Sequence, residues 1–475
     1  MKKIKVAYLG AELTPLAKVG GLGDVMGALP KAMKKLNVDA RVFLPFYGSI
    51  DRNSVELVLV VENLVVNSAF PAVNVWQAVL PGSDVILYLL EHPMYAGTEI
   101  YSNEELVGKG LKMGAAERFV FFCQAALAAM LKVKYIPDIV HLNDWHTAGF
   151  LPYLEELKNQ EAAFKKVKTV YTIHNLANQG VTPVQEVDLP SIELVKRATF
   201  DGNINFMAMG ILGADIVNTV SETYAKEILT SEQGAGLEKI LYLRKDVLCG
   251  VVNGIDQELF NPLTDKFLVK NFDIDSIEDA INNKTELQKE VGLPINQEKM
   301  LAGLVSRFVG QKGLDLISEN MFELDMQFVF LGSGSQEIEE RLLAISSKYP
   351  DKFKVVLGFD AGLAQRIYAG SDLFLMPSRF EPCGLGQMIA MRYGSLPLVR
   401  KTGGLADTVS GRIGFIFNNY DSKELFLSIK KALKLYTSDK LNWKKRQQKA
   451  MSLDFSWKKS AKKYKILYKK LLTLS

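Results

Sequence analysis

Cysteine is scarce in this 475-residue chain, and its distribution excludes two kinds of stabilised fold. Cys123, Cys249 and Cys383 are far apart, so they suggest neither a disulfide framework nor a CxxC zinc pattern. The sequence has no HExxH pattern, and its four histidines all lie in the first half. Because disulfides are typical of oxidising compartments, the sparse cysteines predict a reducing, cytoplasmic location.

Long apolar runs are also missing. The longest nearly apolar stretch, 119–131, contains Gln124 and is shorter than the roughly 20 residues that a membrane span needs. The N-terminus has a short apolar run and no small-residue cleavage site before Glu12, so we expect a β-strand there and not a signal peptide. The sequence therefore predicts no membrane partner.

The charge balance is nearly even and argues against a nucleic-acid partner. Apolar residues make up 48% of the chain and charged residues 23%, which is typical of a globular protein. The net charge is +4, but segment 440–470 holds twelve Lys and Arg residues against the single acid Asp454, so the rest of the chain is net acidic. Such a charge run is more often the solvated face of a helix than a nucleic-acid site.

Two series of short β-rich runs alternate with helical patterns and predict the fold class. In the first series we expect strands at 4–9, 40–44, 84–90, 138–142, 167–173, 215–220 and 248–253, with helices at 24–36, 115–131 and 221–229. In the second we expect strands at 300–306, 327–331, 353–357, 372–376, 396–399 and 414–417. This alternation predicts an α/β protein with two doubly wound, Rossmann-like domains. The polar segment 256–283 is the expected boundary.

The first motif with chemical content is Lys18-Val-Gly-Gly-Leu-Gly-Asp24, which follows the first expected strand. Glycines at a strand-to-helix turn allow backbone amides to approach an anion, and Lys18 adds a cation. The order of residues is neither a P-loop nor a dinucleotide fingerprint. A packing role for the glycines remains the alternative.

Two histidine motifs follow neighbouring expected strands. His141-Leu-Asn-Asp-Trp-His146 and His174-Asn175 both fall at strand carboxyl ends, where ligands of doubly wound sheets bind. The first spacing could suggest a metal site, but no third ligand is evident, so we expect no metal. Any one of these histidines could instead be a buried structural group.

The second half of the chain carries cations and glycine turns after its own strands. Arg307 leaves one strand, and Gln311-Lys-Gly-Leu314 stands at a predicted helix start, so Arg307 and Lys312 suit a diphosphate. Glu337 replaces the third glycine of a dinucleotide fingerprint, which disfavours a nicotinamide dehydrogenase. Glu381 lies just before a helix expected from about Leu385, and Thr402-Gly-Gly-Leu-Ala-Asp407 forms another glycine turn.

Together these motifs resemble bacterial glycogen synthases and plant starch synthases, a family of retaining glucosyltransferases with the GT-B fold. The matching stretches are 18–24, 141–146, 174–175, 253–256, 306–313, 378–384 and 402–407, and 454–457 is similar to the family's closing segment. The resemblance implies an N-terminal, acceptor-side domain at 1–255, a nucleotide-sugar-binding domain at 256–455 and a C-terminal helix at 456–475 that returns to the first domain. It also implies an active site in the interdomain cleft.

The same resemblance implies the reaction and its residues. Glucose would pass from ADP-glucose to the non-reducing end of an α-1,4-glucan such as glycogen, with anomeric retention and without cofactor or metal. The implied catalytic residues are His174, Glu381, Asp144, Arg307 and Lys312, and the implied donor-binding residues are Lys18, Gly20, Gly21, Asp24, Asn253, Arg307, Lys312, Phe359, Cys383, Gly384, Leu385, Gly386, Thr402 and Gly403.

Three alternatives stay open at this point. They are a transferase that uses UDP-glucose, a glucan phosphorylase with pyridoxal phosphate, and a non-catalytic glucan-binding protein. The last is disfavoured because the motifs suit phosphate and offer no aromatic platform. The sequence does not determine the acceptor length or the oligomeric state.

Overall fold

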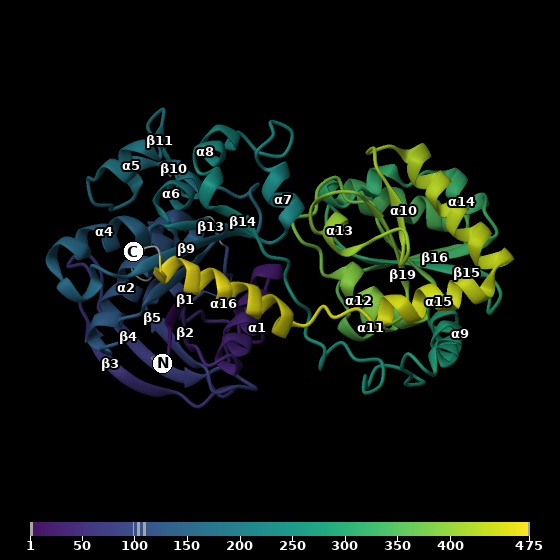
Figure 1. Ribbon diagram of the computed structural model, residues 1–475, viewed down its shortest axis with the longest axis horizontal. Helices are drawn as coiled ribbons and strands as arrows, with labels where there is room; N and C mark the ends of the chain where they lie inside the picture. Colours follow the sequence, from purple (N-terminus) through teal and green to yellow (C-terminus); the bar gives the residue numbers. More distant parts are fainter. Residues whose placement is uncertain (1–2, 98, 102–104, 108–110, 474–475) are drawn as a thin grey trace. The chain divides into compact units, whose positions relative to one another are not determined.

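The computed structural model describes residues 3–97, 99–101, 105–107 and 111–473. Contacts within the chain divide it into two compact units (Figure 1). Unit 1 consists of Met1–Val251 with Trp457–Ser475, and unit 2 consists of Val252–Ser456. Over the described ranges, no helix has both the length and the apolar character to cross a bilayer.

Unit 1 is a nine-stranded sheet covered by helices. Its sheet strands are β1 (Lys5–Leu9), β2 (Asp39–Pro45), β3 (Val58–Leu64), β4 (Val73–Val79), β5 (Ile86–Glu91), β8 (Ile139–Asn143), β9 (Lys168–Ile173), β13 (Ile216–Thr219) and β14 (Leu248–Gly250). The order is β14-β13-β9-β8-β1-β2-β5-β4-β3, parallel from β14 to β5 and antiparallel at β4 and β3. Its helices are α1 (Gly21–Lys35), α2 (Ala115–Lys132), α3 (Trp145–Ala148), α4 (Phe150–Gln160), α5 (Glu193–Arg197), α6 (Phe206–Gly213), α7 (Glu222–Glu227), α8 (Glu238–Leu243) and α16 (Trp457–Thr473).

Smaller elements complete unit 1. They are the pair β6 (Glu105–Val107) and β7 (Leu111–Met113), and the antiparallel sheet of β10 (Val181–Pro183), β12 (Asn203–Asn205) and β11 (Thr199–Phe200). All seven strands expected in the first series are present, because buried parallel strands have continuous apolar runs. The sequence missed β3, an exposed edge strand with little alternation, and its half-buried neighbour β4. The eight-residue connection between them, 65–72, lacks a two-residue hairpin turn.

Helix α16 joins unit 1 through a buried polar network and packs beside α1 (Figure 1). The Tyr468 hydroxyl lies 2.6 Å from His141 Nδ1 and 3.0 Å from the Tyr8 hydroxyl. His141 Nε2 lies 2.6 Å from Thr172 Oγ1. Both ring nitrogens of His141 therefore have protein partners, and this histidine ties the C-terminal helix to β8 and β9.

Unit 2 is a six-stranded parallel sheet of Rossmann order. Its strands are β15 (Met300–Val305), β16 (Met326–Gly332), β17 (Phe353–Leu357), β18 (Leu373–Met376), β19 (Leu396–Arg400) and β20 (Phe415–Phe417). Its helices are α9 (Ala280–Glu290), α10 (Gln336–Lys348), α11 (Ala361–Gly370), α12 (Gly386–Arg392), α13 (Gly403–Thr408), α14 (Ser422–Ser438) and α15 (Lys440–Met451). The order β17-β16-β15-β18-β19-β20 confirms the doubly wound sheet predicted for the second series.

The predicted helix start at Gln311 to Leu314 is wrong. Strand β15 is followed by three short 3-10 helices, Gly310–Lys312, Leu314–Leu316 and Glu319–Glu323. Gly313 has φ +71°, and a Cβ there would lie 2.0 Å from the Pro377 carbonyl oxygen. The left-handed backbone and this close approach interrupt the helix, and glycine is required at the break.

Both sheets reverse their strand order at one point, and most of the motifs lie beside it. In unit 1 the order reverses between β1 and β8, and in unit 2 between β15 and β18. The crevice outside the carboxyl ends of such strands is the usual ligand site of an open α/β sheet. The glycine loop follows β1 and Asp144 follows β8, while Arg307 follows β15 and Glu381 follows β18.

Candidate active site

The glycine loop of unit 1 is held by a buried glutamate that the sequence analysis overlooked. Glu12 is 3% exposed, and its Oε2 accepts hydrogen bonds from the backbone amides of Val19 and Gly20, at 2.9 and 2.7 Å. The Tyr101 hydroxyl donates to Glu12 Oε1 at 2.5 Å. This corrects one prediction, because the Gly20 amide expected to face a substrate anion is already bonded to a carboxylate.

Helix α1 begins earlier than expected, and its first turn contains the other loop glycines. Gly21 is its first residue, and no heavy atom lies within 4 Å of the position that a Cβ would take there. Lys18 Nζ lies 2.7 Å from Asp24 Oδ1, with side chains 47% and 30% exposed. The loop thus presents an exposed lysine whose charge is partly balanced by Asp24, next to an open helix N-terminus.

Asp144 and His174 meet at the carboxyl ends of β8 and β9. Asp144 Oδ1 accepts a hydrogen bond from the His174 backbone amide at 2.7 Å. Asp144 has φ +54° and ψ 179°, a strained conformation for a residue with a side chain. Strain of this kind persists where surrounding contacts enforce it, and here the carboxylate holds the turn that carries His174.

Burial shifts the pKa values of Asp144 and of the three nearby histidines. It raises the pKa of Asp144 to about 7, although the amides of His174 and Asn175 oppose the shift. It lowers the pKa of His174 to about 3, and those of His141 and His146 likewise. The three imidazoles are therefore neutral near pH 7, and Asp144 is the group that titrates there.

This shift predicts a pH-dependent stability. An aspartate in the unfolded chain titrates near pH 4. Between about pH 4 and about pH 7, the folded protein holds a proton on Asp144 that the unfolded chain has lost, so its contribution to stability falls as the pH rises. We expect the unfolding free energy of Asp144→Asn, measured by urea titration, to fall less across this window than that of the parent. Equal pH slopes would show that Asp144 titrates normally in the fold.

Two of the motif histidines of unit 1, His141 and His146, are engaged in other contacts. Both nitrogens of His141 are occupied by hydroxyls, and the His146 ring packs against Trp145 and Phe119, with centroids 4.2 and 4.7 Å away. Within the described ranges, no three His, Cys, Asp or Glu side chains converge on a point that could hold a metal ion.

Activity should accordingly survive metal removal. We expect the turnover rate after prolonged treatment with EDTA to equal the untreated rate within experimental error. Lysine, arginine and backbone amides are available to balance the negative charge of a diphosphate without a metal ion. The measurement is the rate before chelation, after it, and after adding back Zn²⁺ or Mg²⁺. A loss with EDTA that either ion reverses would contradict the assignment.

The centre of the unit 2 site is a buried carboxylate with two partners. Glu381 is 5% exposed, and its Oε2 lies 2.7 Å from Lys312 Nζ and accepts a hydrogen bond from Ser378 Oγ at 3.0 Å. Lys312 comes from the turn after β15, while Ser378 and Glu381 come from the loop after β18. The structure therefore brings two predicted residues together at the switch point and adds Ser378.

Glycines allow two loops of unit 2 to touch. Gly403 has φ +43°, and a Cβ there would lie 2.0 Å from the Glu381 carbonyl oxygen; a Cβ at Gly404 would lie 2.1 Å from the Cys383 carbonyl oxygen. The Gly404 amide donates to the Glu381 carbonyl at 3.1 Å. The predicted glycine turn after β19 thus supports the backbone of the Glu381 loop.

The remaining donor-side residues differ in exposure. Cys383 and Asn253 are buried next to each other, and burial raises the pKa of the Cys383 thiol to about 12, so it stays protonated. Asn253 is 7% exposed, and its Oδ1 has no hydrogen-bond partner among the described residues.

Leu385 and Gly386 are half-buried at the start of α12, and Thr402 is buried. Arg307 is exposed, and Phe359 is 87% exposed after β17.

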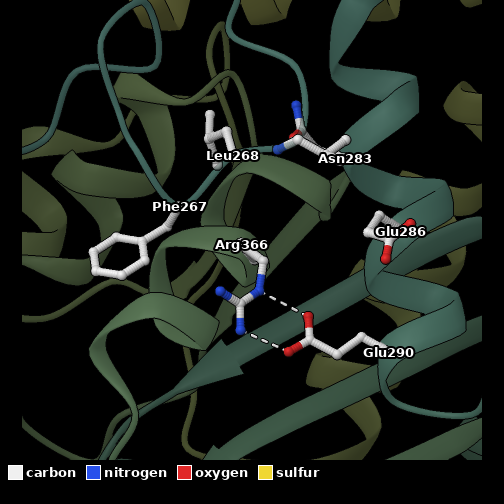
Figure 2. Close-up of a pocket in the computed structure, with 7 residues that line it drawn as sticks. Phe267, Leu268, Asn283, Glu286, Glu290 and Arg366 are labelled. Carbon is white, nitrogen blue, oxygen red and sulfur yellow. Dashed lines mark hydrogen bonds and ion pairs between the residues drawn. The ribbon is translucent and has the colours of Figure 1, made fainter.

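A separate hollow lies on unit 2 between α9, α11 and segment 267–269 (Figure 2). It measures about 380 Å³, and its lining includes an ion pair in which Arg366 Nε and Nη2 donate to the two Glu290 carboxylate oxygens, at 2.7 and 2.6 Å. None of the predicted site residues lines this pocket. It is therefore not part of the predicted site.

Glu12, Asn143 and Ser378 are the site residues that sequence reasoning missed. Each contacts a predicted residue or loop: Glu12 the glycine loop, Asn143 the His174 ring, and Ser378 the Glu381 carboxylate. Asn143 lies inside the motif 141–146, and Ser378 lies inside the motif 378–384. Their position at or just after strand ends was a usable signal, and Glu12, three residues after β1, carried the same signal.

Comparison with known proteins covers both units. The family model for the starch synthase catalytic domain matches residues 5–242, and the model for glycosyl transferases group 1 matches residues 283–450. The glycogen synthases of Thermotoga maritima and Geotalea daltonii are each 42% identical to this chain, covering 99% of it and 99% of the relative.

Solved structures agree with these matches. The catalytic domain of starch synthase IV from Arabidopsis thaliana, bound to ADP and acarbose, is 33% identical with a TM-score of 0.88, over 99% of this chain and 100% of that chain. Sucrose-phosphate synthase from Thermosynechococcus elongatus, 16% identical with a TM-score of 0.58, shares the fold.

Two Rossmann-like units with cation-bearing loops at their switch points, together with these matches, define a glycosyltransferase of the GT-B fold. The resemblance seen in the sequence motifs is thereby confirmed. The chain belongs to the glycogen and starch synthase family.

Proposed function

We propose that this enzyme transfers glucose from ADP-glucose to the non-reducing end of an α-1,4-glucan, with retention of the anomeric configuration. The observation that carries the proposal is the 42% identity to glycogen synthases over 99% of both chains. The plant relative solved with ADP and acarbose supports an adenine nucleotide and a glucan-like ligand.

The departing diphosphate gains negative charge as the glycosidic bond breaks, and fixed cations lower the barrier to that step. We assign this task to Lys18, Arg307 and Lys312, helped by the amides of Gly21 and of the Cys383 to Gly386 loop. Lys18 is paired with Asp24, and Lys312 with Glu381, so both lysines are held in place before the donor arrives. Asn253, Phe359, Thr402 and Gly403 complete the assigned donor site.

The reacting sugar is assigned to Glu381, His174 and Asp144. A buried carboxylate such as Glu381 accepts hydrogen bonds from sugar hydroxyls and favours nearby positive charge. The neutral His174, through its ring or its backbone carbonyl, stabilises the positive charge that develops at the anomeric carbon. Asp144 holds a sugar hydroxyl and also fixes the His174 backbone.

Retention is assigned to attack by the acceptor hydroxyl on the same face as the leaving phosphate, which takes the proton. The protonated Cys383 thiol is not a nucleophile at working pH. Glycosidases achieve retention with two carboxyl groups about 5 Å apart, one of them a nucleophile. Of the two assigned catalytic carboxylates, Asp144 lies in unit 1 and Glu381 lies in unit 2. The Glu381 carboxylate is already bonded to Lys312 and Ser378.

The test is a transfer assay with purified protein, glycogen as acceptor and either ADP-glucose or UDP-glucose as donor. We expect incorporation of glucose from ADP-glucose at a higher kcat/KM than from UDP-glucose. A preference for UDP-glucose would overturn the donor assignment. Release of glucose 1-phosphate from glycogen and phosphate, with absorbance of a lysine-bound pyridoxal phosphate, would instead identify a phosphorylase.

The domain roles and the location belong to the same proposal. Residues 1–255 are assigned to the acceptor, residues 256–455 to the nucleotide sugar and residues 456–475 to a returning helix. The three cysteines are all free, which supports a reducing, cytoplasmic location.

A further inference from the structure

Asn143 is the last residue of β8 and is 1% exposed. Its Oδ1 lies 2.9 Å from Nε2 of His174. The Asn143 backbone amide donates to Thr147 Oγ1 at 2.7 Å, which fixes the residue at the start of the turn. A buried asparagine therefore faces the ring of the histidine assigned to the reacting sugar.

The surroundings of Asn143 decide which end of its amide faces His174. Its Nδ2 donates to the Leu9 carbonyl oxygen at 2.9 Å and lies 3.4 Å from the His141 carbonyl oxygen. A flipped amide would place Oδ1 against these two oxygens, with no hydrogen between them. The oxygen of Asn143 is thus the end that faces the imidazole.

An amide oxygen only accepts hydrogen bonds, so Nε2 of His174 is the donor and carries the ring proton. We propose that Asn143 is a positioning residue that fixes His174 as the Nε2-protonated neutral tautomer and leaves the Nδ1 lone pair for the substrate. This inference rests on the proposed function, which assigns His174 to the sugar. Burial lowers the pKa of His174 to about 3, in agreement with a neutral ring.

The tautomer determines what His174 can do. No described residue hydrogen-bonds to Nδ1, so this nitrogen is the edge of the half-buried ring that can accept from a sugar hydroxyl or face a positive centre. The opposite tautomer would turn an N–H toward that centre and repel the charge. Asn143 would therefore affect kcat more than donor binding.

The direct test is the ¹⁵N spectrum of the full chain labelled at histidine, with His174→Gln used to identify the His174 signals. At pH 7 we expect Nε2 to show the shift of a protonated nitrogen and Nδ1 that of a bare one. The reverse pattern, or an imidazolium, would overturn the proposal. This measurement is independent of glucose transfer, so failure of the transfer assay would refute the proposed function and leave the tautomer to be decided by the spectrum.

The kinetic test uses two substitutions that differ in charge. Asn143→Leu removes the acceptor, and we expect kcat to fall by roughly a hundredfold, as for a displaced catalytic group, with donor KM little changed. Asn143→Asp places a carboxylate on Nε2 and favours the imidazolium, so activity should be lost at low pH and recover as the pH rises. Among the described residues, the other titratable groups that interact with His174 are His141 from β8, His146 from α3 and Asp144, and these are the same in both variants.

The matched control is Asn218→Leu on β13. Asn218 is fully buried and donates to Thr172 Oγ1 and the Tyr464 hydroxyl, at 3.2 and 3.0 Å, so the variant loses a buried asparagine without touching His174. We expect it to lower stability but to keep the parent tautomer and pH profile. A folded Asn143→Leu with parent kcat, or an Asn143→Asp with the parent pH profile, would refute the proposal.

Discussion

Replacing Glu381 with alanine should reduce kcat by roughly a hundredfold or more, since losing one preorganised electrostatic contact in the transition state costs about 3 kcal/mol. The carboxylate is buried and carries hydrogen bonds from both Lys312 and Ser378. Its removal takes a negative charge away from the developing positive sugar and also releases Lys312 from its position. Donor KM should change less than kcat, because Arg307 and the backbone amides remain. Steady-state kinetics with ADP-glucose would measure both.

A matched control is available in the same unit. Glu290→Ala also removes a glutamate that pairs with a cation, Arg366, but it does so in the pocket of Figure 2, whose lining contains no assigned site residue. We expect this variant to keep the parent kcat and to lose at most a little stability, since the pair is half-exposed. Near-normal turnover of Glu381→Ala would show that the carboxylate does not act on the sugar.

His174→Ala should have a comparable effect, with kcat lowered by roughly a hundredfold and donor binding largely retained. The ring is held by Asn143 and the backbone by Asp144, so the residue is ordered before substrate binds. Loss of the ring removes the lone pair assigned to the developing positive charge. The alanine keeps the backbone carbonyl, so a small loss of activity would transfer the role from ring to backbone. Single-turnover rates would separate the chemical step from product release.

His92→Ala serves as the control for loss of a buried histidine. His92 is 3% exposed, and burial lowers the pKa of its imidazole to about 4, as it does for His174. Its ring packs on Phe121 and caps the 3-10 helix at Pro93–Tyr95. Neither of these two contacts involves an assigned site residue. We expect lower thermal stability with normal turnover. If this variant lost as much kcat as His174→Ala, the effect would reflect folding and not chemistry.

The sequence by itself determined the parallel strands of the two large sheets, the fold class and the family. Buried parallel strands leave continuous apolar runs, and this local signal located β1, β8, β15 and β18 to within a residue or two at each end. Because the carboxyl ends of these strands form the ligand crevice, the sequence alone singles out residues such as Lys18, Asp144, Arg307 and Glu381.

Only the tertiary structure decided which of these residues have partners and which are open. Glu12 and Gly20 are eight positions apart, yet the Glu12 carboxylate accepts a hydrogen bond from the Gly20 backbone amide, which was expected to face a substrate anion. His141 resembled a site residue, but Tyr468, 327 positions away, engages its ring and makes it part of the α16 attachment. Lys312 and Glu381 are 69 positions apart and form one ion pair.

The physical reason is that hydrogen bonds and ion pairs act over a few ångströms, whereas sequence patterns report burial along a single element. A strand pattern places a residue at the end of a sheet but carries no information on the side chain that meets it there. The proton on Nε2 of His174 is the clearest case. It depends on the direction of one amide in Asn143, which is set by the carbonyl oxygen of Leu9 on the neighbouring strand.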